Sequence, residues 1–260
     1  MTNMGETDIQ LSVVLPVRNE KENLPAVITE LFRNIGDAIK EIIIVDDCSS
    51  DSTSTLADQL SASYAKIKVI HRTPPNGLGR AILDGFANAS GNYALTIDSD
   101  MEMLPGEIPR MIAKLRSTGC DVVVGSRFTE GSVLEGYSRF KYFFNRAFNS
   151  IFKYMLGTHI SDLTFGFKIL RDVVTRVKWE SETHGIAGET TMKPIALGFT
   201  VEEVPVSWIR RKHGESKFRI SYYYEYLRVG IKASIQRLVR MLKRPHIISH
   251  LLYNITVASK

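Results

Sequence analysis

Residues 11–17 read LSVVLPV and residues 41–45 read EIIIV. Neither run alternates apolar with polar side chains, and such runs are typical of strands that are buried on both faces of a parallel sheet. The segment between them has apolar residues at helical spacing, so it predicts an amphipathic helix. We expect Asn19 to cap this helix and Glu22 to complete a capping box.

The same alternation of strands and helices continues toward residue 124. Gly77 and Gly79 stand in a glycine-rich turn that leads into a helix. Repeated strand–helix units predict an α/β fold with a doubly wound, mostly parallel sheet of the Rossmann-like kind. The further strands expected in this part span residues 67–70, 93–97 and 121–124, and the further helices span residues 51–60 and 105–116.

The alternation is less regular in the second half of the chain. Residues 136–157 and 188–197 have helical patterns, whereas residues 165–170 and 200–206 read as strands. The last forty residues predict a long helix with an apolar stripe formed by Leu227, Ile231, Ile235, Leu238 and Leu242. We therefore expect a tail at residues 1–10, one domain over residues 11–220 and a basic amphipathic helical segment over residues 221–260.

Composition excludes several classes of protein. The 44% of hydrophobic and 23% of charged residues are ordinary for a globular chain of 260 residues. Two cysteines, Cys48 and Cys120, are too few for a disulfide framework, and the first ten residues lack the apolar core of a secretory signal. No uninterrupted apolar stretch is long enough to predict a membrane span.

Basic residues are concentrated toward the end of the chain, whose net charge is +5. Residues 208–244 contain eleven basic residues and only two acidic ones. A local block of this kind predicts an anionic partner, and a membrane surface, a phosphate or a nucleic acid would each satisfy it. The chain has no base-reading motif, which argues against nucleic acid.

Polar clusters follow four of the expected strands. In a doubly wound sheet the ligand lies at the carboxyl ends of the strands, so these clusters are expected to meet at one edge. They are residues 18–20 after the first strand, Asp46 and Asp47 after the second, residues 98–100 after the fourth and Arg127 after the fifth.

Asp98 and Asp100 are separated by one residue at a strand end. Two carboxylates placed in this way can share a hard divalent cation with the oxygens of a bound diphosphate, and Glu102 can add a third oxygen. A solvated turn is the alternative, because so short a motif also arises by chance. Asp47 can accept hydrogen bonds from a nucleotide, although it or Ser49 can instead cap a helix.

Taken together, these segments resemble the family-2 glycosyltransferases with a GT-A fold. The resemblance rests on LSVVLPVRNEKENLP, EIIIVDDCSSDST, NGLGRAILDGFANASGNY and TIDSD, in this order and spacing. The later segments DVVVGSRF, DLTFGFKIL and RRKHGESK, together with Arg139, are similar to the branch that transfers mannose or glucose to polyprenyl or dolichyl phosphate. The matches span residues 10–220, and the set is far more specific than any single piece.

This resemblance implies an inverting transfer of a sugar from a nucleotide-sugar donor whose diphosphate lies on Mg²⁺ or Mn²⁺. It implies that Asp98, Asp100 and Glu102 hold the metal and that Asp100 is catalytic. The branch resemblance favours GDP-mannose as the donor, with UDP-glucose as the alternative. Two residues depart from the family pattern: Arg18 replaces a frequent aromatic residue, which bears on base stacking, and Cys48 replaces a frequent glycine in the turn after Asp47. The implied donor-binding residues are Pro16, Val17, Arg18, Glu20, Asp47, Gly79, Asp98, Ser99, Arg211 and Lys217.

The acceptor implied by this branch is a polyprenyl or dolichyl phosphate. A lipid monophosphate is already an anion at neutral pH, so it needs no general base, unlike a sugar hydroxyl. The QxxRW motif of processive polysaccharide synthases is absent. We expect Arg127 and Arg139 to be catalytic and to grip the acceptor phosphate, and Arg211, His213 and Lys217 to close over the donor diphosphate.

The basic C-terminal helix predicts peripheral attachment to the cytoplasmic face of a membrane, with a membrane partner subunit as a further candidate. The alternative is a helix that docks on its own domain or on a partner. Two other functions stay open: a family-2 transferase with a soluble or glycan acceptor, and a non-catalytic protein that binds a nucleotide sugar. The intact pair Asp98 and Asp100 argues against the second.

Overall fold

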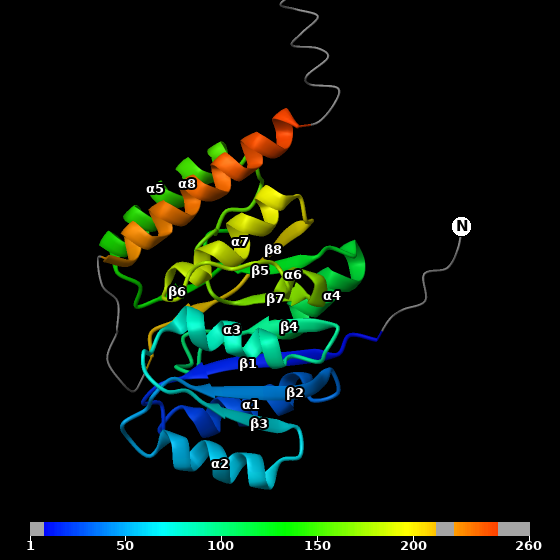
Figure 1. Ribbon diagram of the computed structural model, residues 1–260, viewed down its shortest axis with the longest axis vertical. Helices are drawn as coiled ribbons and strands as arrows, with labels where there is room; N and C mark the ends of the chain where they lie inside the picture. The colour runs from blue at the N-terminus through cyan, green and yellow to red at the C-terminus, as the bar shows by residue number, and fades with distance from the viewer. Residues whose placement is uncertain (1–7, 212–220, 244–260) are drawn as a thin grey trace, which may run out of the picture.

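A seven-stranded sheet forms the centre of the computed structural model, which describes residues 8–211 and 221–243 (Figure 1). The strand order is β3-β2-β1-β4-β7-β5-β8, and a separate two-stranded sheet pairs β6 with β9. The strands are β1 Leu11–Val17, β2 Ile39–Asp46, β3 Ile67–His71, β4 Tyr93–Thr96, β5 Val122–Ser126, β6 Leu134–Glu135, β7 Lys168–Arg171, β8 Val201–Pro205 and β9 Trp208–Ile209.

Most neighbouring strands of the large sheet are parallel, as the unbroken apolar runs predict. β1 pairs in parallel with β2 and β4, β2 with β3, and β5 with β8. β7 is the exception, since it runs antiparallel to both of its neighbours, β4 and β5. The carboxyl ends of β1, β2, β4 and β5 therefore lie at the same edge of the sheet.

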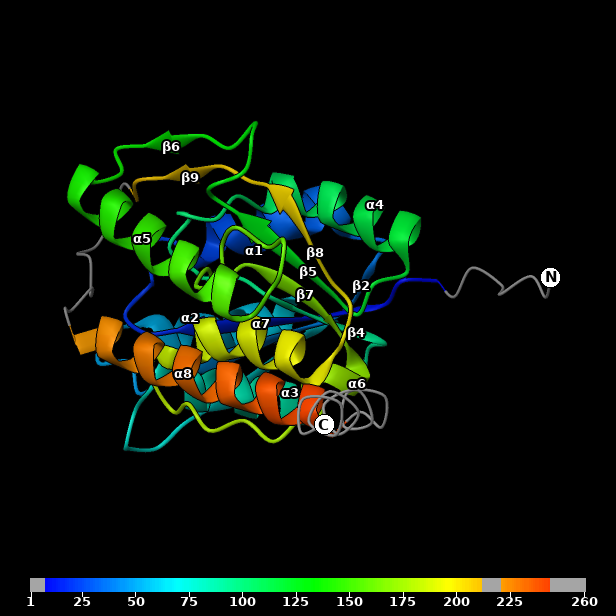
Figure 2. The same cartoon turned by 90° about the horizontal axis from the view of Figure 1, so that it is seen from above.

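Helices cover both faces of the sheet, which confirms the doubly wound arrangement (Figures 1 and 2). Apolar residues of α1, α2 and α4 share one core with the sheet, and those of α3, α5, α6, α7 and α8 share a second. The α-helices are α1 Leu24–Ile35, α2 Thr53–Ser63, α3 Leu78–Asn88, α4 Ile108–Thr118, α5 Arg139–Met155, α6 Asp172–Thr175, α7 Gly185–Leu197 and α8 Ser221–Leu242, and η1 Pro105–Glu107 is a 3-10 turn.

The predicted capping box at the start of α1 is wrong. Asn19 lies before the helix with a left-handed φ of 55°, and its side-chain oxygen accepts a hydrogen bond from the Ser50 amide at 2.8 Å. The helix begins at Leu24, and Asn23 at the N-cap position makes no side-chain capping bond. Asn19 thus joins the loops after β1 and β2, which keeps residues 18–20 out of the helix and at the sheet edge.

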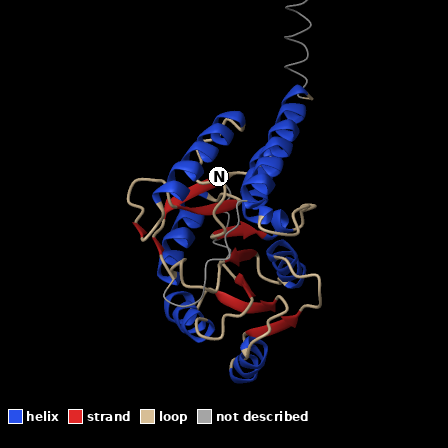
Figure 3. Cartoon of the chain, turned by 90° about the vertical axis from the view of Figure 1, so that its left-hand side faces the viewer, coloured by secondary structure: helices blue, strands red, loops and turns tan. Residues whose placement is uncertain are grey.

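The apolar stripe predicted on the last helix exists, but it faces away from the domain. Side chains of the stripe such as Ile235 and Leu238 are 56% exposed, whereas Val229 and Ala233 on another side of α8 are buried. The helix approaches α5 closely at Gly230, where an added Cβ would lie 2.4 Å from the Phe152 ring. Figures 1 and 3 show α5 and α8 running side by side. Among the helices that are described, none is long and apolar enough to cross a membrane.

The close packing of α3 on β1 gives a prediction about stability. A Cβ at Gly85 would lie 2.3 Å from Cγ1 of Val14, so Gly85→Ala should lower the free energy of unfolding by about 1–3 kcal/mol despite the better helix propensity of alanine. Gly106→Ala is the matched control, since its Cβ would meet only the Asn34 side chain at 3.6 Å. Denaturant titration measures both, and equal stabilities would contradict the packing.

Candidate active site

The loop after β4 carries the predicted acidic cluster. The side chain of Asp100 is buried and accepts a hydrogen bond from the Glu102 amide at 3.0 Å. Met101, between them, has a left-handed φ of 62°, which is costly for a residue with a long side chain. This strained turn brings the carboxylate of Glu102 back toward that of Asp100.

Negative charge is concentrated in this loop. Burial raises the pKa of Asp98 well above its ordinary value, and the nearby charges of Asp100 and Glu102 raise it further. Burial also raises the pKa of Asp100, with the charge of Glu102 as the next cause. Glu20, at the end of β1, acts in the same direction on both groups. A cation is the group that would relieve this repulsion.

Arg211 supplies positive charge to the cluster. Its Nη2 donates to Asp100 Oδ2 at 2.5 Å, and its Nε donates to Glu102 Oε1 at 2.8 Å. The indole N–H of Trp208 donates to the other oxygen of Glu102 at 3.2 Å. Within the described residues, no three acidic, histidine or cysteine side chains are grouped to hold a metal ion. Two members of the expected set of three carboxylates, Asp100 and Glu102, hold Arg211 in this structure.

The donor chemistry still fits a hard divalent cation. Oxygen ligands from one or two carboxylates are what Mg²⁺ takes when substrate phosphates complete its coordination. Asp98 and Asp100 are such a pair, and burial, followed by the charges of neighbouring carboxylates, raises the pKa of each carboxyl. The described residues thus offer two carboxylates that suit a metal, with Arg211 in contact with one of them.

Hydrogen bonds tie both this loop and the end of β2 to the end of β1. The hydroxyl of Ser99 donates to the carbonyl of Pro16 at 3.2 Å, and the Asp47 amide donates to the carbonyl of Val17 at 2.9 Å. The three strand ends of β1, β2 and β4 are therefore in direct contact. The predicted donor-binding residues Pro16, Val17, Asp47 and Ser99 come together as expected.

The carboxylate of Asp47 has partners within the protein. One oxygen forms an ion pair with Arg72, and the other accepts a hydrogen bond from the Gly77 amide at 2.8 Å. The alternative role of Asp47 or Ser49 as a helix cap is wrong, since Ser52 occupies the N-cap position of α2. Asp47 instead fixes the start of the glycine-rich turn next to the edge of the sheet.

Glu20 and Arg18 differ in their surroundings. Glu20 is buried, and its carboxylate accepts a hydrogen bond from the Asn23 side chain at 2.8 Å. Arg18 is exposed, and its guanidinium faces the side-chain amide of Asn76. The two residues thus lie on opposite sides of the same turn, one turned toward the acidic cluster and one toward the glycine-rich segment.

Glycine is required at position 79 because the backbone of residues 181–183 lies too close to leave room for a side chain. A Cβ at Gly79 would lie 2.2 Å from the carbonyl oxygen of Ser181 and 2.5 Å from the carbonyl carbon of Glu182. The Arg80 amide donates to the Glu182 carbonyl at 3.0 Å. The close approach expected between this turn and a donor is thus, in this structure, an approach to residues 181–183.

Arg127 is engaged with other side chains of the protein. Its Nε donates to Asp162 Oδ2 at 2.7 Å, and its Nη2 donates to Asp162 Oδ1 at 3.0 Å. Tyr137 accepts a further hydrogen bond, and the Phe165 ring lies 4.3 Å below the guanidinium. Although burial opposes the charged form, Asp162 raises the pKa of Arg127 above its ordinary value. In this structure Arg127 is therefore paired with Asp162, and its contact with an acceptor phosphate stays a prediction.

Arg139 differs from Arg127, because it is exposed at the first position of α5. Lys141, two positions further along α5, lies near the cluster. Burial lowers the pKa of Lys141, and the negative charge of Glu102 opposes this effect. The first turn of α5 is thus close to the acidic loop. His213 and Lys217 lie outside the described residues.

Three residues of this region were not singled out by the sequence. Asp162 stands within the segment DLTFGFKIL, where only the resemblance drew attention to it. Trp208 reaches the cluster from β9, which is 106 positions from Glu102 in the sequence. Lys168 is fully buried in β7, where its ammonium donates to Thr190 Oγ1 at 2.6 Å and burial lowers its pKa to about 7. No local pattern marks the last two.

Comparisons with known sequences agree with this geometry. Residues 12–177 match the model of the family described as Glycosyl transferase family 2. A dolichol-phosphate mannosyltransferase of Pyrococcus furiosus is 34% identical over 229 residues, 85% of this chain, and this chain spans 62% of that relative's length. A polyprenol monophosphomannose synthase of Mycolicibacterium smegmatis is 30% identical over 213 residues, which is 79% of each chain.

Solved structures show the same fold. Glucosyl-3-phosphoglycerate synthase from Mycobacterium tuberculosis, in complex with Mn²⁺, uridine diphosphate and glucosyl-3-phosphoglycerate, has a TM-score of 0.65 and 21% sequence identity. The match covers 88% of this chain and 79% of that one. The complex of that enzyme with phosphoglyceric acid has a TM-score of 0.66 at 19% identity and the same coverage. This likeness confirms the GT-A-like α/β fold.

The Arg127–Asp162 pair gives a second prediction. Asp162→Ala should lower the free energy of unfolding by about 3–5 kcal/mol, because it leaves the buried Arg127 guanidinium without its counter-charge. Asp172→Ala is the control, since its pair with Arg176 is largely exposed and should contribute about 0–1 kcal/mol. Denaturant titration measures the difference, and a similar loss in both variants would show that Arg127 is not held by Asp162.

Proposed function

This chain belongs to glycosyl transferase family 2, and from this premise we propose that it transfers a sugar from a nucleotide-sugar donor to a polyprenyl or dolichyl phosphate. An acceptor phosphate oxygen attacks the anomeric carbon, the bond from that carbon to the donor diphosphate breaks, and the nucleoside diphosphate leaves with the bonding electrons. Attack opposite the leaving group inverts the configuration. The names of the two relatives, which denote transfer of mannose to lipid phosphates, support this acceptor.

One observation carries the proposal: the acidic cluster lies where two helices with exposed apolar faces begin. Tyr137, two residues before α5, packs against Trp208, whose indole donates to Glu102, so the amino end of α5 is near the acidic cluster. Tyr226, in the first half of α8, is near Arg127 and Asp98, whose charges affect its pKa after the larger effect of burial. A lipid phosphate can therefore reach the polar edge of the sheet while its chain stays on an apolar surface.

The donor is assigned to the edge formed by β1, β2 and β4. Asp98 and Asp100 would hold Mg²⁺ or Mn²⁺ together with Glu102, and the metal would offset negative charge on the leaving nucleoside diphosphate. Pro16, Val17 and Asp47 line the adjoining base and ribose pocket in this proposal. The remaining donor contacts are assigned to Arg18, Glu20, Gly79, Ser99, Arg211 and Lys217.

In this proposal Arg211 contacts two different anionic groups in succession. Its guanidinium now holds the carboxylates of Asp100 and Glu102. We assign it to those carboxylates before the donor arrives and to the donor diphosphate afterwards, since a forked guanidinium suits either anion. Because the carboxylates would then have the metal as their counter-charge, the exchange would leave no buried charge without a partner.

The acceptor phosphate is assigned to Arg139, with Arg127 in a supporting role. Arg139 is exposed at the amino end of α5, where the helix dipole also favours an anion. Arg127 would act through Tyr137 and Asp162, which fix the segment that leads into α5. An acceptor that is already ionised requires no proton to be removed, which is consistent with the absence of a dedicated base in our assignment.

Peripheral binding to the cytoplasmic face of a membrane follows from the same two helices. The outer face of α5 exposes Phe143 at 68% and Tyr154 at 88%, next to the exposed stripe of α8. Exposed apolar surface of this extent marks an interaction site, and each flanking basic residue contributes about 1 kcal/mol near an anionic membrane. A membrane partner subunit could cover part of this face. Docking of α8 on its own domain, the earlier alternative, also holds, through Val229 and Ala233.

The donor is proposed to be GDP-mannose rather than UDP-glucose. The mannose in the names of both relatives favours it. The uridine diphosphate in the glucosyl-3-phosphoglycerate synthase complexes favours the alternative, but those structures are only about one-fifth identical in sequence to this chain and show the fold alone.

A product-partition assay tests the proposal directly. The chain is incubated with radiolabelled GDP-mannose or UDP-glucose, Mg²⁺ or Mn²⁺, and polyprenyl phosphate, and the products are extracted with organic solvent. We expect label in an organic-soluble, mild-acid-labile product that requires both metal and lipid phosphate. Asp100→Asn should abolish this product while the thermal unfolding of the protein is retained, because the variant loses a metal carboxylate but keeps the shape of the side chain.

The other results of this assay are equally informative. Label that appears only in water-soluble products would favour a soluble or glycan acceptor and contradict the lipid acceptor. Metal-dependent donor binding without turnover on any acceptor would favour a non-catalytic nucleotide-sugar-binding protein. Full activity of Asp100→Asn would contradict the metal site.

Arg139→Ala tests the acceptor assignment. We expect the KM for polyprenyl phosphate to rise about tenfold or more, because a charge-assisted contact to the phosphate is lost, while the KM for the donor changes little. Arg110→Ala is a suitable control, since its exposed side chain lies on α4 and its polar contacts within the described part of the chain are with Glu107 and the Pro205 carbonyl. Initial rates over both substrate concentrations separate the two effects. A larger change in the donor KM would assign Arg139 to the donor instead.

A further inference from the structure

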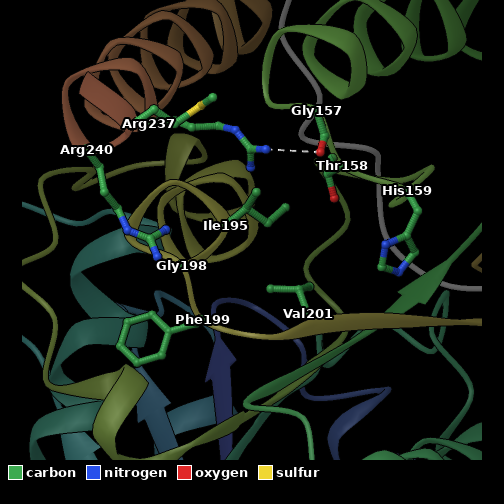
Figure 4. A pocket seen from close by; sticks show the side chains of 10 residues that line it. Gly157, Thr158, His159, Ile195, Gly198, Phe199, Val201, Arg237 and Arg240 are labelled. Atoms are coloured by element: carbon green, nitrogen blue, oxygen red, sulfur yellow. Dashed lines mark hydrogen bonds between the residues drawn. The ribbon is translucent and has the colours of Figure 1, made fainter. Parts of the chain in front are cut away.

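A cavity of about 390 Å³ lies under the far ends of α5 and α8 (Figure 4). It is bounded by the loop after α5, the end of α7, the start of β8 and the last turns of α8. Two arginines, one histidine and several apolar side chains line it. The lining residues are Gly157, Thr158, His159, Ile195, Gly198, Phe199, Val201, Arg237, Arg240 and Met241.

This cavity is distinct from the acidic edge. β8 is parallel to β5, whose carboxyl end carries Arg127, so the start of β8 lies at the opposite edge of the sheet. Arg237 and Arg240 stand about 25 Å along α8 from its first residue, at the usual helical rise. None of the residues assigned to donor, metal or acceptor lines this cavity.

The two arginines are half-buried and have no acidic partner among the described residues. Arg237 Nη2 donates to the Gly157 carbonyl at 3.2 Å, and Arg240 Nη1 lies 3.5 Å from the Ala196 carbonyl. His159, which also lines the cavity, forms an ion pair with Glu202 at 3.8 Å, and Glu202 is not part of the lining. Both guanidiniums therefore keep their charge at the cavity without a carboxylate to offset it.

Helix capping accounts for only part of this arrangement. Each arginine uses one N–H on a carbonyl near the end of α5 or α7, and a guanidinium has five. Gly198, with φ at 90°, admits Arg240 closely, since a Cβ there would lie 2.0 Å from the guanidinium carbon. A cap alone would not require two cations beside one cavity. The remaining N–H donors suit an anion with several oxygens.

We propose that this cavity binds a phosphate group of an amphiphilic or small phosphate ester. Arginine forks match phosphate oxygens, and Ile195, Phe199 and Val201 offer apolar walls to the carbon part of the ligand. An anionic phospholipid head group and a soluble phosphate ester share this chemistry. The lipid source rests on the membrane contact proposed above, whereas the phosphate site itself does not depend on sugar transfer.

Site-resolved arginine modification of the unaltered protein tests the proposal. Mass spectrometry measures phenylglyoxal labelling of Arg237, Arg240 and Arg228. The labelling is carried out in the presence of glycerol 3-phosphate, of phosphatidylcholine vesicles, or of vesicles that also contain phosphatidylglycerol. We expect Arg237 and Arg240 to be protected and Arg228 on the same helix to stay reactive. Protection by glycerol 3-phosphate assigns a soluble ester, and protection only by phosphatidylglycerol assigns a lipid head group. Equal labelling of all three arginines in every arm would overturn the site.

Vesicle sedimentation gives an independent measurement. Arg237→Gln with Arg240→Gln should weaken binding to phosphatidylglycerol vesicles about tenfold more than Arg228→Gln with Lys232→Gln, which removes the same charge from the same helix. Glutamine can still donate to the carbonyls near Gly157 and Ala196, and circular dichroism checks the fold. If the two double variants bind the vesicles equally weakly, the two arginines act only as general surface charge, and the proposed site is wrong. Loss of sugar transfer with retained protection would contradict only the proposed function.

Discussion

Excess negative charge at the end of β4 is the constraint around which the acidic edge is organised. Asp98, Asp100 and Glu102 lie within five positions of one another, with Glu20 close enough to affect them. Repulsion between carboxylates in a poorly solvated place is costly unless a cation lies among them. Arg211 provides that cation in this structure, and a divalent metal that also binds a diphosphate would provide it equally well.

A different polar contact fixes the second half of the chain to this edge. Arg127, at the end of β5, binds Asp162 and Tyr137, and Tyr137 in turn accepts a hydrogen bond from Asn145 in α5 at 2.6 Å. Tyr137 also packs edge-on against Trp208, whose indole reaches the acidic cluster. One buried network therefore sets the positions of α5 and β9 relative to the carboxylates.

The sequence predicts the order of elements well because burial leaves a strong local pattern. The runs at residues 11–17 and 41–45 are apolar on both faces, and they are central strands. The antiparallel insertion of β7 between β4 and β5 leaves no such pattern, since direction depends on the path of the connection. The N-cap of α1 was mispredicted for a similar reason: the bond of Asn19 to Ser50 joins loops that are distant in sequence.

The site shows the same division between local and distant information. Asp98 and Asp100 are recognisable because their spacing and their position after a strand are local properties. The partner of Arg127 is not recognisable in this way, so an arginine that is paired with Asp162 was expected to be available to a ligand.

The outer face of α8 is the clearest case of information that is distant in sequence. Its stripe predicts an amphipathic helix, but small residues such as Gly230 and Ala233 decide which side packs on the domain. Close packing through small side chains leaves the large apolar ones, Ile235 and Leu238 among them, directed outward. A helix in water alone would gain by the reverse arrangement, so the outward apolar side chains of α8 support the proposal that this face contacts an apolar partner.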